Sequence, residues 1–211
     1  AGVQEEEFRA LKERVPALDS IWWMPNGKRT AGRVAARRPD AAPGAAFGQV
    51  NAAVAAELRR RVIERVVAHE PAHVIDGYAG TGETAIALAS PTRCVTAIEL
   101  DQAASAWCAE RLPAGSRAIS ARVETALAAG LPADVVVLNP PRAGTDQRVT
   151  QVLEVATPRP RAIVYVSCDP ATLARDLGRL PSWRIASLVS FDMFPQTAHV
   201  ETVCELVPED A

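Results

Sequence analysis

The sequence of 211 residues contains no apolar run near the roughly 18 residues that a membrane-spanning helix needs. Its first residues include Glu5, Glu6 and Glu7, whereas a secretory signal peptide begins with basic residues followed by an apolar stretch. The formal net charge is −2, so the overall charge gives no basis for binding nucleic acid, and only a local basic patch could provide one. We therefore expect neither a membrane protein nor a secretory leader.

Cysteine is scarce and scattered along the chain. The four cysteines stand at 94, 108, 168 and 204, with no C-x-x-C pair and no cluster of cysteine and histidine. Disulfide frameworks and zinc sites have recognisable spacings, so we expect neither of them and no other metal site. Scattered cysteines in a chain without a secretion signal are typical of the reducing cytoplasm, and a cytoplasmic location is the expectation.

Apolar residues make up 48% of the sequence and charged residues 23%, which is sufficient for a packed core. Residues 1–44 contain a short helical stretch, a hairpin signal at Asn26-Gly27 and a linker rich in proline and alanine. From residue 45 onward, strand-like apolar runs alternate with helical stretches. We therefore expect a short N-terminal helix and hairpin extension at 1–44 and one folded domain at 45–211.

The alternation after residue 45 predicts an α/β fold. The runs at 135–138 and 162–166 are continuously apolar, as expected of strands that are covered on both faces. Further strands are expected at 73–76, 94–100, 184–191 and 199–206, and helices at 51–69, 102–112, 170–180 and between the glycine turn and residue 89. The pattern predicts a doubly wound, mostly parallel sheet of the Rossmann-like type.

A glycine-containing turn, Asp76 to Gly82, follows the strand at 73–76. Its glycines allow a tight turn and a close approach of a ligand to the backbone. Glu99 ends the next strand, where a carboxylate can accept hydrogen bonds from two ribose hydroxyls. The pattern indicates a nucleoside cofactor or, alternatively, a purely structural turn. The third glycine of the dinucleotide fingerprint is missing, so S-adenosylmethionine, which has no pyrophosphate, fits better than NAD.

A second turn, Asn139-Pro140-Pro141-Arg142, follows the apolar strand at 135–138. An Asn/Asp-Pro-Pro turn at this place is common in methyltransferases that act on bases or amides. Methylators of exocyclic amines usually carry an aromatic residue after the prolines, so Arg142 argues against that chemistry. The alternative interpretation is a rigid turn without a role in catalysis.

Cys168 lies directly after a buried strand and before the helix at 170–180. Ligands bind at this edge of a doubly wound sheet, and a helix N-terminus lowers a thiol pKa. Cys168 is therefore the candidate nucleophile. Cys94, Cys108 and Cys204 lie within strand or helix patterns and are interpreted as inert core residues.

Five motifs follow one another along the chain: Phe47-Gly48-Gln49-Val50-Asn51, Asp76 to Gly82, Asn139 to Arg142, Ser167-Cys168-Asp169-Pro170-Ala171-Thr172, and Phe194-Pro195-Gln196-Thr197-Ala198-His199-Val200-Glu201. Together they resemble the catalytic domain of the RNA uracil-5-methyltransferase family, whose members make 5-methyluridine in tRNA and rRNA. The resemblance covers residues 45–211. It implies S-adenosylmethionine as cofactor, a uridine in tRNA or rRNA as substrate, and an antiparallel last strand in the sheet.

By this resemblance, Cys168 is the nucleophile that adds to carbon 6 of uracil and makes carbon 5 reactive. Glu201 matches the base that removes the proton from carbon 5, a role for which partial burial would raise its pKa usefully. His199 would share the strand face of Glu201, but the chemistry does not need an imidazole, so a structural role is expected.

The cofactor contacts that we expect are Gly80 and Gly82 of the glycine turn and, by resemblance, Gln49, Tyr78, Glu83, Glu99 and Asn139. Two of these depart from the family pattern. Position 139 is more often Asp, so Asn139 lacks a negative charge, although it keeps an acceptor and gains a donor. Glu83 stands where Asn or a small polar residue is commoner.

RNA is the partner that the resemblance implies. Full-length family members carry an oligonucleotide-binding barrel and a central RNA-contacting domain, and residues 1–44 resemble the tail of that central domain. Between Lys28 and Arg65, nine basic residues stand against three acidic ones, with Trp22 and Trp23 just upstream. Such a stretch can stack bases and hold phosphates; the alternative is a packed hairpin and a solvated helix face.

Three functions remain open at this point. The first is an RNA uracil-C5-methyltransferase or its catalytic domain. The second is a methyltransferase of the same fold that acts on an exocyclic amine or a small molecule. The third is a non-catalytic module that binds S-adenosylmethionine.

Overall fold

The computed structural model describes residues 20–23, 32–36, 52–192 and 200–210. The chain divides into two units, Ala1–Gly48 and Gln49–Ala211. In the first unit, β1 (Ser20–Trp23) pairs antiparallel with β2 (Gly32–Ala36). The two strands of the expected hairpin are thereby confirmed, while its Asn26-Gly27 turn and the helical stretch expected near the N-terminus lie outside the described residues.

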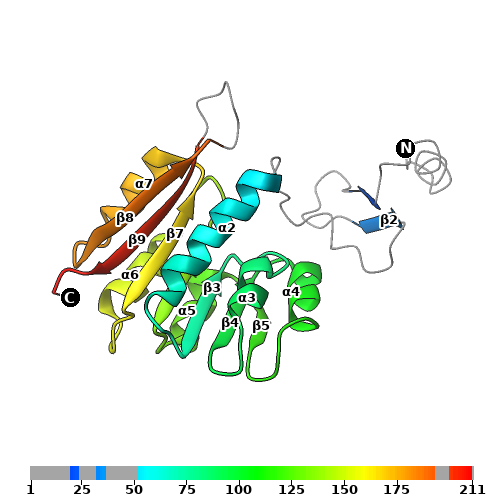
Figure 1. Ribbon diagram of the computed structural model, residues 1–211, viewed down its shortest axis with the longest axis horizontal. Coiled ribbons are helices and arrows are strands. Elements are labelled where there is room, and N and C mark those ends of the chain that lie inside the picture. Colours follow the sequence, from blue (N-terminus) through cyan, green and yellow to red (C-terminus); the bar gives the residue numbers. More distant parts are fainter. Residues whose placement is uncertain (1–19, 24–31, 37–51, 193–199, 211) are drawn as a thin grey trace. The chain divides into compact units, whose positions relative to one another are not determined.

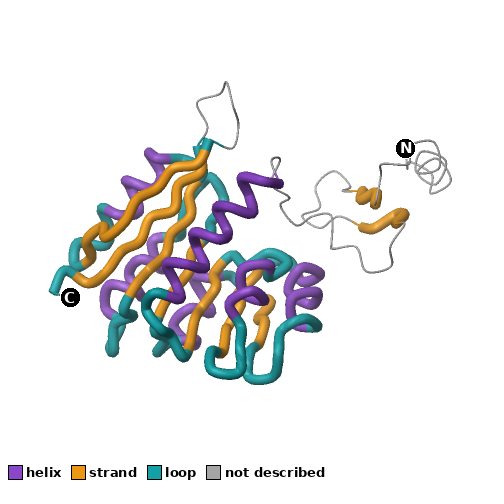
Figure 2. The backbone as a smooth tube through the Cα atoms, viewed as in Figure 1, coloured by secondary structure: helices purple, strands orange, loops and turns teal. Residues whose placement is uncertain are grey.

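A seven-stranded sheet forms the centre of the second unit (Figures 1 and 2). Its strands lie in the order β5 (Arg117–Ser120), β4 (Cys94–Glu99), β3 (His73–Gly77), β6 (Val135–Leu138), β7 (Ala162–Ser167), β9 (Glu201–Pro208) and β8 (Trp183–Phe191). The first five strands run parallel to one another, whereas β9 runs antiparallel to both β7 and β8. The predicted doubly wound α/β sheet with an antiparallel last strand is confirmed.

Helices cover both faces of this sheet, and Figure 1 shows α2 and α3 in front of the strands and α6 and α7 behind them. One face carries α2 (Ala52–Val67), α3 (Glu83–Leu88) and α4 (Gln102–Ala109). The other face carries α5 (Val123–Gly130), α6 (Gln147–Val155) and α7 (Pro170–Leu177). Each layer of helices buries its own cluster of apolar side chains against the strands.

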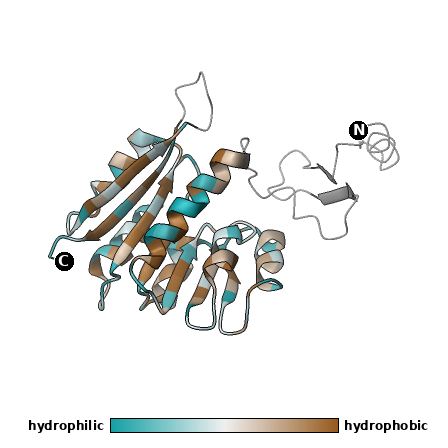
Figure 3. Cartoon of the chain, in the orientation of Figure 1, coloured by the Kyte–Doolittle hydropathy of each residue, from teal (hydrophilic) through white to brown (hydrophobic). Residues whose placement is uncertain are grey.

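The central strands supply side chains to both clusters in alternation. On β6, Val135 and Val137 pack into the cluster under α2, whereas Val136 and Leu138 pack into the cluster under α5 and α6. Figure 3 shows the resulting apolar colour along the central strands. Because each fully buried Val or Leu side chain stabilises the fold by about 1.5–3 kcal/mol, burial on both faces holds these strands at the centre of the domain.

The strand ends define the edge at which a ligand can bind. β3 pairs with β4 on one side and with β6 on the other, so the chain order reverses between β3 and β6. Such a switch point leaves a crevice beyond the carboxyl ends of the strands. The loops after β3, β4, β6 and β7 all lie at this edge, and β9 begins there because it runs antiparallel to β7.

Three elements are absent from the sequence predictions: β5, α5 and α6. β5 is a four-residue edge strand with exposed ends, and α5 lacks a capping side chain, so neither leaves a strong sequence signal. The predicted helix at 170–180 ends at Leu177. The N-cap expected at Asn51 lies outside the described residues.

In the described part of the chain, no helix combines the length and the apolar character needed to cross a membrane.

Candidate active site

The glycine turn after β3 takes backbone conformations that favour glycine. Gly80 has a φ of +58° and Gly82 a φ of +80°. A Cβ on Gly82 would lie 2.1 Å from the Sγ atom of Cys108, so the close packing of the turn on α4 excludes any side chain there. A Cβ on Gly80 would meet nothing within 4 Å. Gly82 is therefore required by packing, whereas the backbone at Gly80 has open space beside it that a ligand could enter.

The carboxylate of Glu99, at the end of β4, is held against this turn by two backbone amides. The amide of Gly80 donates to its Oε2 atom at 2.8 Å, and the amide of Asp101 donates to its Oε1 atom at 2.7 Å. Each carboxylate oxygen keeps a second lone pair. Glu99 is thus fixed in position with acceptor capacity left for two hydroxyl groups, as the sequence analysis expects of a ribose-binding acid.

Asp76 is a buried carboxyl group near the end of β3. Its residue is 2% exposed, and its Oδ2 atom has no hydrogen-bond partner among the described residues. Burial raises the pKa of Asp76 to about 7; the amide of Ala85 opposes the rise and the Glu99 carboxylate adds to it. An orphaned buried acceptor beside an open glycine turn fits a ligand that brings a donor or a positive charge.

The raised pKa of Asp76 makes a prediction about stability. The folded chain binds the Asp76 proton more tightly than the unfolded chain, so stability falls as the pH rises from near 4 to near 7. Asp76→Asn removes this dependence. We compare the difference in melting temperature, variant minus wild type, at two pH values. This difference should be larger at about pH 8 than at about pH 5, by about 5 °C or more. Parallel melting profiles of the two proteins would contradict the assignment.

The remaining expected cofactor residues lie in different surroundings. Glu83, the first residue of α3, forms an ion pair with Arg59, and its side chain is 63% exposed. Asn139 is exposed, and its backbone amide donates to the carbonyl of Gly77 at 3.2 Å. Tyr78 packs against the cluster under α5 and α6, where burial raises its pKa to about 12. Gln49 lies outside the described residues.

Cys168 and Glu201 meet at the same edge of the sheet. Ser167 at the end of β7 is paired with Thr202 on β9 in antiparallel register. The next position outward on each chain is Cys168 and Glu201, so the register places these two residues opposite each other. Cys168 is half-buried, and Glu201 is 3% exposed. Burial raises the pKa of Glu201, in the direction that the sequence analysis expects.

Arg142 is a residue of this site that the sequence analysis considers only as evidence against amine chemistry. Its guanidinium lies close enough to lower the pKa of Cys168, of Glu201 and of Asp169. An exposed cation beside a thiol and a buried carboxyl favours the ionised form of both. Its place after two prolines gives no sequence signal for this contact, since the contact depends on how the loop after β6 packs against α7.

The expectation that a helix N-terminus lowers the thiol pKa is wrong in its net direction. The pKa of Cys168 is raised, first by burial and then by the Glu201 carboxylate, while Arg142 opposes both. Asp169 caps the helix that begins beside Cys168. The Oδ1 atom of Asp169 accepts hydrogen bonds from the amides of Ala171 and Thr172, both at 2.9 Å, so these amides do not face the sulfur.

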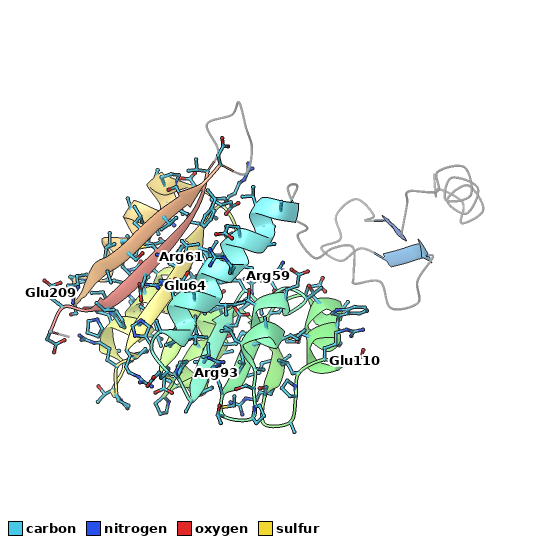
Figure 4. The ribbon with its side chains drawn as sticks, viewed as in Figure 1. Arg59, Arg61, Glu64, Arg93, Glu110 and Glu209 are labelled. Carbon is cyan, nitrogen blue, oxygen red and sulfur yellow. The ribbon has the colours of Figure 1, made fainter. Side chains whose placement is uncertain are left out.

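The arginines of α2 form ion pairs within the protein, and Figure 4 labels two of them, Arg59 and Arg61, on this helix. They pair with acidic side chains as follows: Arg59 with Glu83, Arg60 with Glu57, Arg61 with Glu64, and Arg65 with Glu64 and Glu205. Arg61 also donates to the Oγ atom of Ser187 at 3.0 Å. This pattern favours the interpretation of α2 as a solvated, paired helix face rather than an RNA-binding patch.

The strand order and the glycine turn at this edge are those of a Rossmann-like α/β fold, which S-adenosylmethionine-dependent methyltransferases of known structure share. Magnesium protoporphyrin IX methyltransferase from Synechocystis, solved with bound SAM, matches with a TM-score of 0.57 and 15% identity, over 77% of this chain and 86% of that one. At this identity the match shows the fold alone. Pyrococcus abyssi tRNA (uracil-54, C5)-methyltransferase, solved in complex with S-adenosyl-L-homocysteine, matches with a TM-score of 0.67 and 29% identity, over 90% of this chain and 45% of that one.

Matches in sequence narrow the assignment further than the shared fold does. The family model described as tRNA (Uracil-5-)-methyltransferase matches residues 117–207. The 23S rRNA (uracil(747)-C(5))-methyltransferase RlmC of Cronobacter sakazakii is 36% identical over 168 residues, or 77% of this chain, and RlmC of Vibrio vulnificus is 34% identical over 166 residues, or 76% of this chain. The chain is therefore similar in sequence to the RNA uracil-5-methyltransferase family. It spans 44% of the length of these two relatives.

Proposed function

We propose that this chain carries the catalytic domain of an RNA uracil-C5-methyltransferase that uses S-adenosylmethionine. The observation that carries the proposal is the meeting of Cys168 and Glu201 across the β7–β9 register, with Arg142 beside both. They lie at the same sheet edge as the glycine turn and Glu99. A nucleophile, a buried carboxyl group and a cation at one ligand-binding edge support covalent catalysis on a base.

Cys168 solves the first chemical problem, which is that carbon 5 of uracil is a weak nucleophile. When the thiolate forms a bond from sulfur to carbon 6, the electron pair of the C5–C6 double bond moves to give an enolate, and carbon 5 becomes nucleophilic. The thiol must first lose its proton. Burial and Glu201 disfavour the thiolate, whereas Arg142 favours it, so the guanidinium is the group that makes the nucleophile available.

Glu201 solves the second problem, which is the release of the product. Once methylated, carbon 5 carries both a methyl group and a proton. The Glu201 carboxylate accepts that proton, the C5–C6 double bond re-forms, and the bond between sulfur and carbon 6 breaks to return the thiolate. A carboxylate whose pKa is raised by burial is a stronger base, which suits this proton transfer.

S-adenosylmethionine would supply an electrophilic methyl group when bound. The fit rests on the orphaned Oδ2 atom of buried Asp76, the open space at Gly80 and the fixed carboxylate of Glu99. Glu99 would accept from ribose hydroxyls, and Asp76 would accept from a donor of the ligand. The roles of Gln49, Tyr78, Glu83 and Asn139 in this binding stay predictions.

The proposed substrate is a uridine in RNA. Relatives named for 23S rRNA and for tRNA both match, so the proposal covers both RNA classes. The target base must lie outside a stacked helix, because stacking shields carbon 6 from a thiolate. Residues 1–44 are proposed to belong to an RNA-contacting segment.

Trapping with 5-fluorouridine tests this function. Fluorine on carbon 5 cannot leave as the proton does, so the adduct between enzyme and RNA persists. With S-adenosylmethionine and fluorinated tRNA or 23S rRNA fragments, we expect a covalent complex that mass spectrometry maps to the peptide containing Cys168. Cys94→Ala is the matched control, because this free cysteine begins β4 at the opposite edge of the sheet, and the variant should form the complex normally.

Two other outcomes would overturn the proposal. Methyl transfer without any adduct, and persisting in Cys168→Ala, would indicate a methyltransferase of the same fold with another substrate. Binding of S-adenosylmethionine with neither methyl transfer nor adduct would indicate a non-catalytic module.

A further inference from the structure

Asp176 on α7 is a fully buried carboxylate with an unusual number of partners. It is 0% exposed. Its Oδ2 atom accepts from the Tyr165 hydroxyl at 2.7 Å, from the Thr145 amide at 2.9 Å and from the Thr145 hydroxyl at 3.2 Å. Its Oδ1 atom accepts from Arg175 at 2.8 and 3.0 Å and from Arg179 at 3.2 Å. Both lone-pair regions of the carboxylate are therefore filled, as a buried charge requires.

These partners keep Asp176 ionised despite its burial. Burial by itself would raise the pKa of the carboxyl group. The hydrogen bonds from Tyr165, Thr145 and Arg175 outweigh burial, so the pKa lies below its ordinary value. A buried group that stays charged needs its donors in place, and those donors are in turn held in place by the charge.

The partners tie the loop after β6 to α7. Thr145 is part of that loop and is bound directly by Asp176. Arg175, oriented by Asp176, donates to the carbonyl of Ala143 at 2.7 Å, and Thr172 on the same helix donates to the carbonyl of Arg142 at 3.2 Å. Three loop residues are thus held from one helix.

Gly144 shows how closely the loop and the helix fit. Its φ is +78°, and a Cβ there would lie 2.4 Å from the Oδ2 atom of Asp176 and 2.4 Å from the Nη2 atom of Arg175. The loop backbone therefore packs directly on the charged pair, with no space for a side chain between them.

The same helix begins beside the nucleophile. α7 starts at Pro170, two residues after Cys168, and Asp169 caps it. One rigid element therefore holds both the segment that carries the thiol and the loop that carries Arg142. We propose that Asp176 is a positioning residue, which fixes the loop of residues 142–145 on α7 so that the Arg142 guanidinium faces Cys168 and Glu201. The catalytic meaning of this inference rests on the proposed function.

The thiol of Cys168 provides a direct measurement in the free protein. Its rate of alkylation by iodoacetamide, followed against pH on the Cys168 peptide, reports how readily the thiolate forms. In Asp176→Asn we expect the pH midpoint to rise, and alkylation near neutral pH to fall about three- to tenfold, because the displaced Arg142 no longer favours the thiolate. The Glu201 carboxylate, which also acts on the thiol, is unchanged in this variant.

The sign of the change separates positioning from a direct effect of charge. If Asp176 acted on the thiol only through its own negative charge, removing that charge would lower the midpoint. A lowered or unchanged midpoint in Asp176→Asn would therefore overturn the proposal. Tyr165→Phe, which removes one donor to Asp176 and keeps the carboxylate, should raise the midpoint by a smaller amount, and it serves as the measured variant if Asp176→Asn does not fold.

A double-mutant cycle identifies the route through Arg142. Arg142→Ala alone should raise the midpoint. If Asp176 acts by positioning that arginine, then adding Asp176→Asn to Arg142→Ala should move the midpoint no further. A further rise in the double variant would show that Asp176 acts by another route and would overturn the proposal.

Asp134→Asn is the matched control. Asp134 precedes β6 at the opposite edge of the sheet, where it accepts from the amides of Ala72 and His73 and pairs with Arg161. This variant should have a lower melting temperature and an unchanged pH midpoint for the alkylation of Cys168. An equal rise in this control would mean that any destabilisation moves the thiol, against the proposal. Because no RNA is used, these results are independent of the 5-fluorouridine trap, so each proposal can fail by itself.

Discussion

Replacing Cys168 by alanine is expected to reduce uracil methylation by about 10⁴-fold or more while leaving cofactor binding within about twofold of the wild type. Alanine has no atom that can add to carbon 6, so carbon 5 keeps its weak nucleophilicity. The glycine turn and Glu99, on which the proposed cofactor site chiefly rests, lie at the ends of β3 and β4, whereas Cys168 follows β7. Transfer of a labelled methyl group to RNA measures the first effect, and calorimetric titration with S-adenosylmethionine measures the second.

The control for this variant is Cys94→Ala, which removes another free, half-buried cysteine. We expect this control to methylate RNA at the wild-type rate. Substantial methylation by Cys168→Ala would mean that the sulfur is not the nucleophile. Loss of cofactor binding together with activity would mean that Cys168 supports the fold of the glycine turn instead.

The central strands were predictable because each of them contains a run of consecutive apolar residues. β6 reads Val135-Val136-Val137-Leu138, and every residue in it is buried. A strand covered on both faces must be apolar at every position, and few other elements have this pattern. β5 and α5 have no such pattern in the sequence. An edge strand such as β5 needs only partial burial, and α5 is stabilised by packing because its N-cap residue makes no side-chain hydrogen bond.

The candidate site was predictable where its residues lie at the ends of strands or in the turns that follow them. The glycines at 80 and 82 and the cysteine after β7 occupy positions that strand order alone brings to one edge. The influence of Arg142 and Asp176 depends on tertiary contacts between a loop and a helix. In the sequence, Asp176 is a charged residue on an amphipathic helix, which by pattern would face solvent. Its burial arises from Tyr165 and Thr145, which lie 11 and 31 positions away.

The direction in which the pKa of Cys168 is shifted was predicted wrongly for a related reason. A rule about helix ends assumes free amide groups in the first turn. Here Asp169 occupies those amides, and the charge balance is set instead by Glu201 from β9 and Arg142 from the loop after β6. The thiol is therefore controlled by groups that are distant in the sequence, and its reactivity depends on how firmly they are held.

Glu201→Gln is expected to accumulate the covalent complex between enzyme and natural RNA, with turnover reduced about 10²- to 10⁴-fold. Glutamine keeps the size of the side chain but cannot accept the proton from carbon 5 as a carboxylate does. The bond between sulfur and carbon 6 then persists after methylation. Denaturing electrophoresis of labelled RNA detects the complex, and mass spectrometry maps it to Cys168.

The same variant should form the adduct more readily than the wild type. The Glu201 carboxylate raises the pKa of Cys168, so a neutral glutamine at this position lowers it and increases the thiolate fraction. We therefore expect faster alkylation of Cys168 in free Glu201→Gln, together with slower release of RNA. A general loss of structure would slow turnover without accumulating the complex, so the two effects together are diagnostic of a base beside the thiol.

Glu205→Gln provides the matched control, because it makes the same substitution on the same strand. Glu205 is also buried, but it binds His69 at 2.7 Å and Arg65 at 3.6 Å, where β9 meets α2. It should cost stability without trapping RNA, since no reacting atom lies there. Normal product release by Glu201→Gln, or equal trapping by both variants, would remove Glu201 from the role of base and leave the proton of carbon 5 to another group.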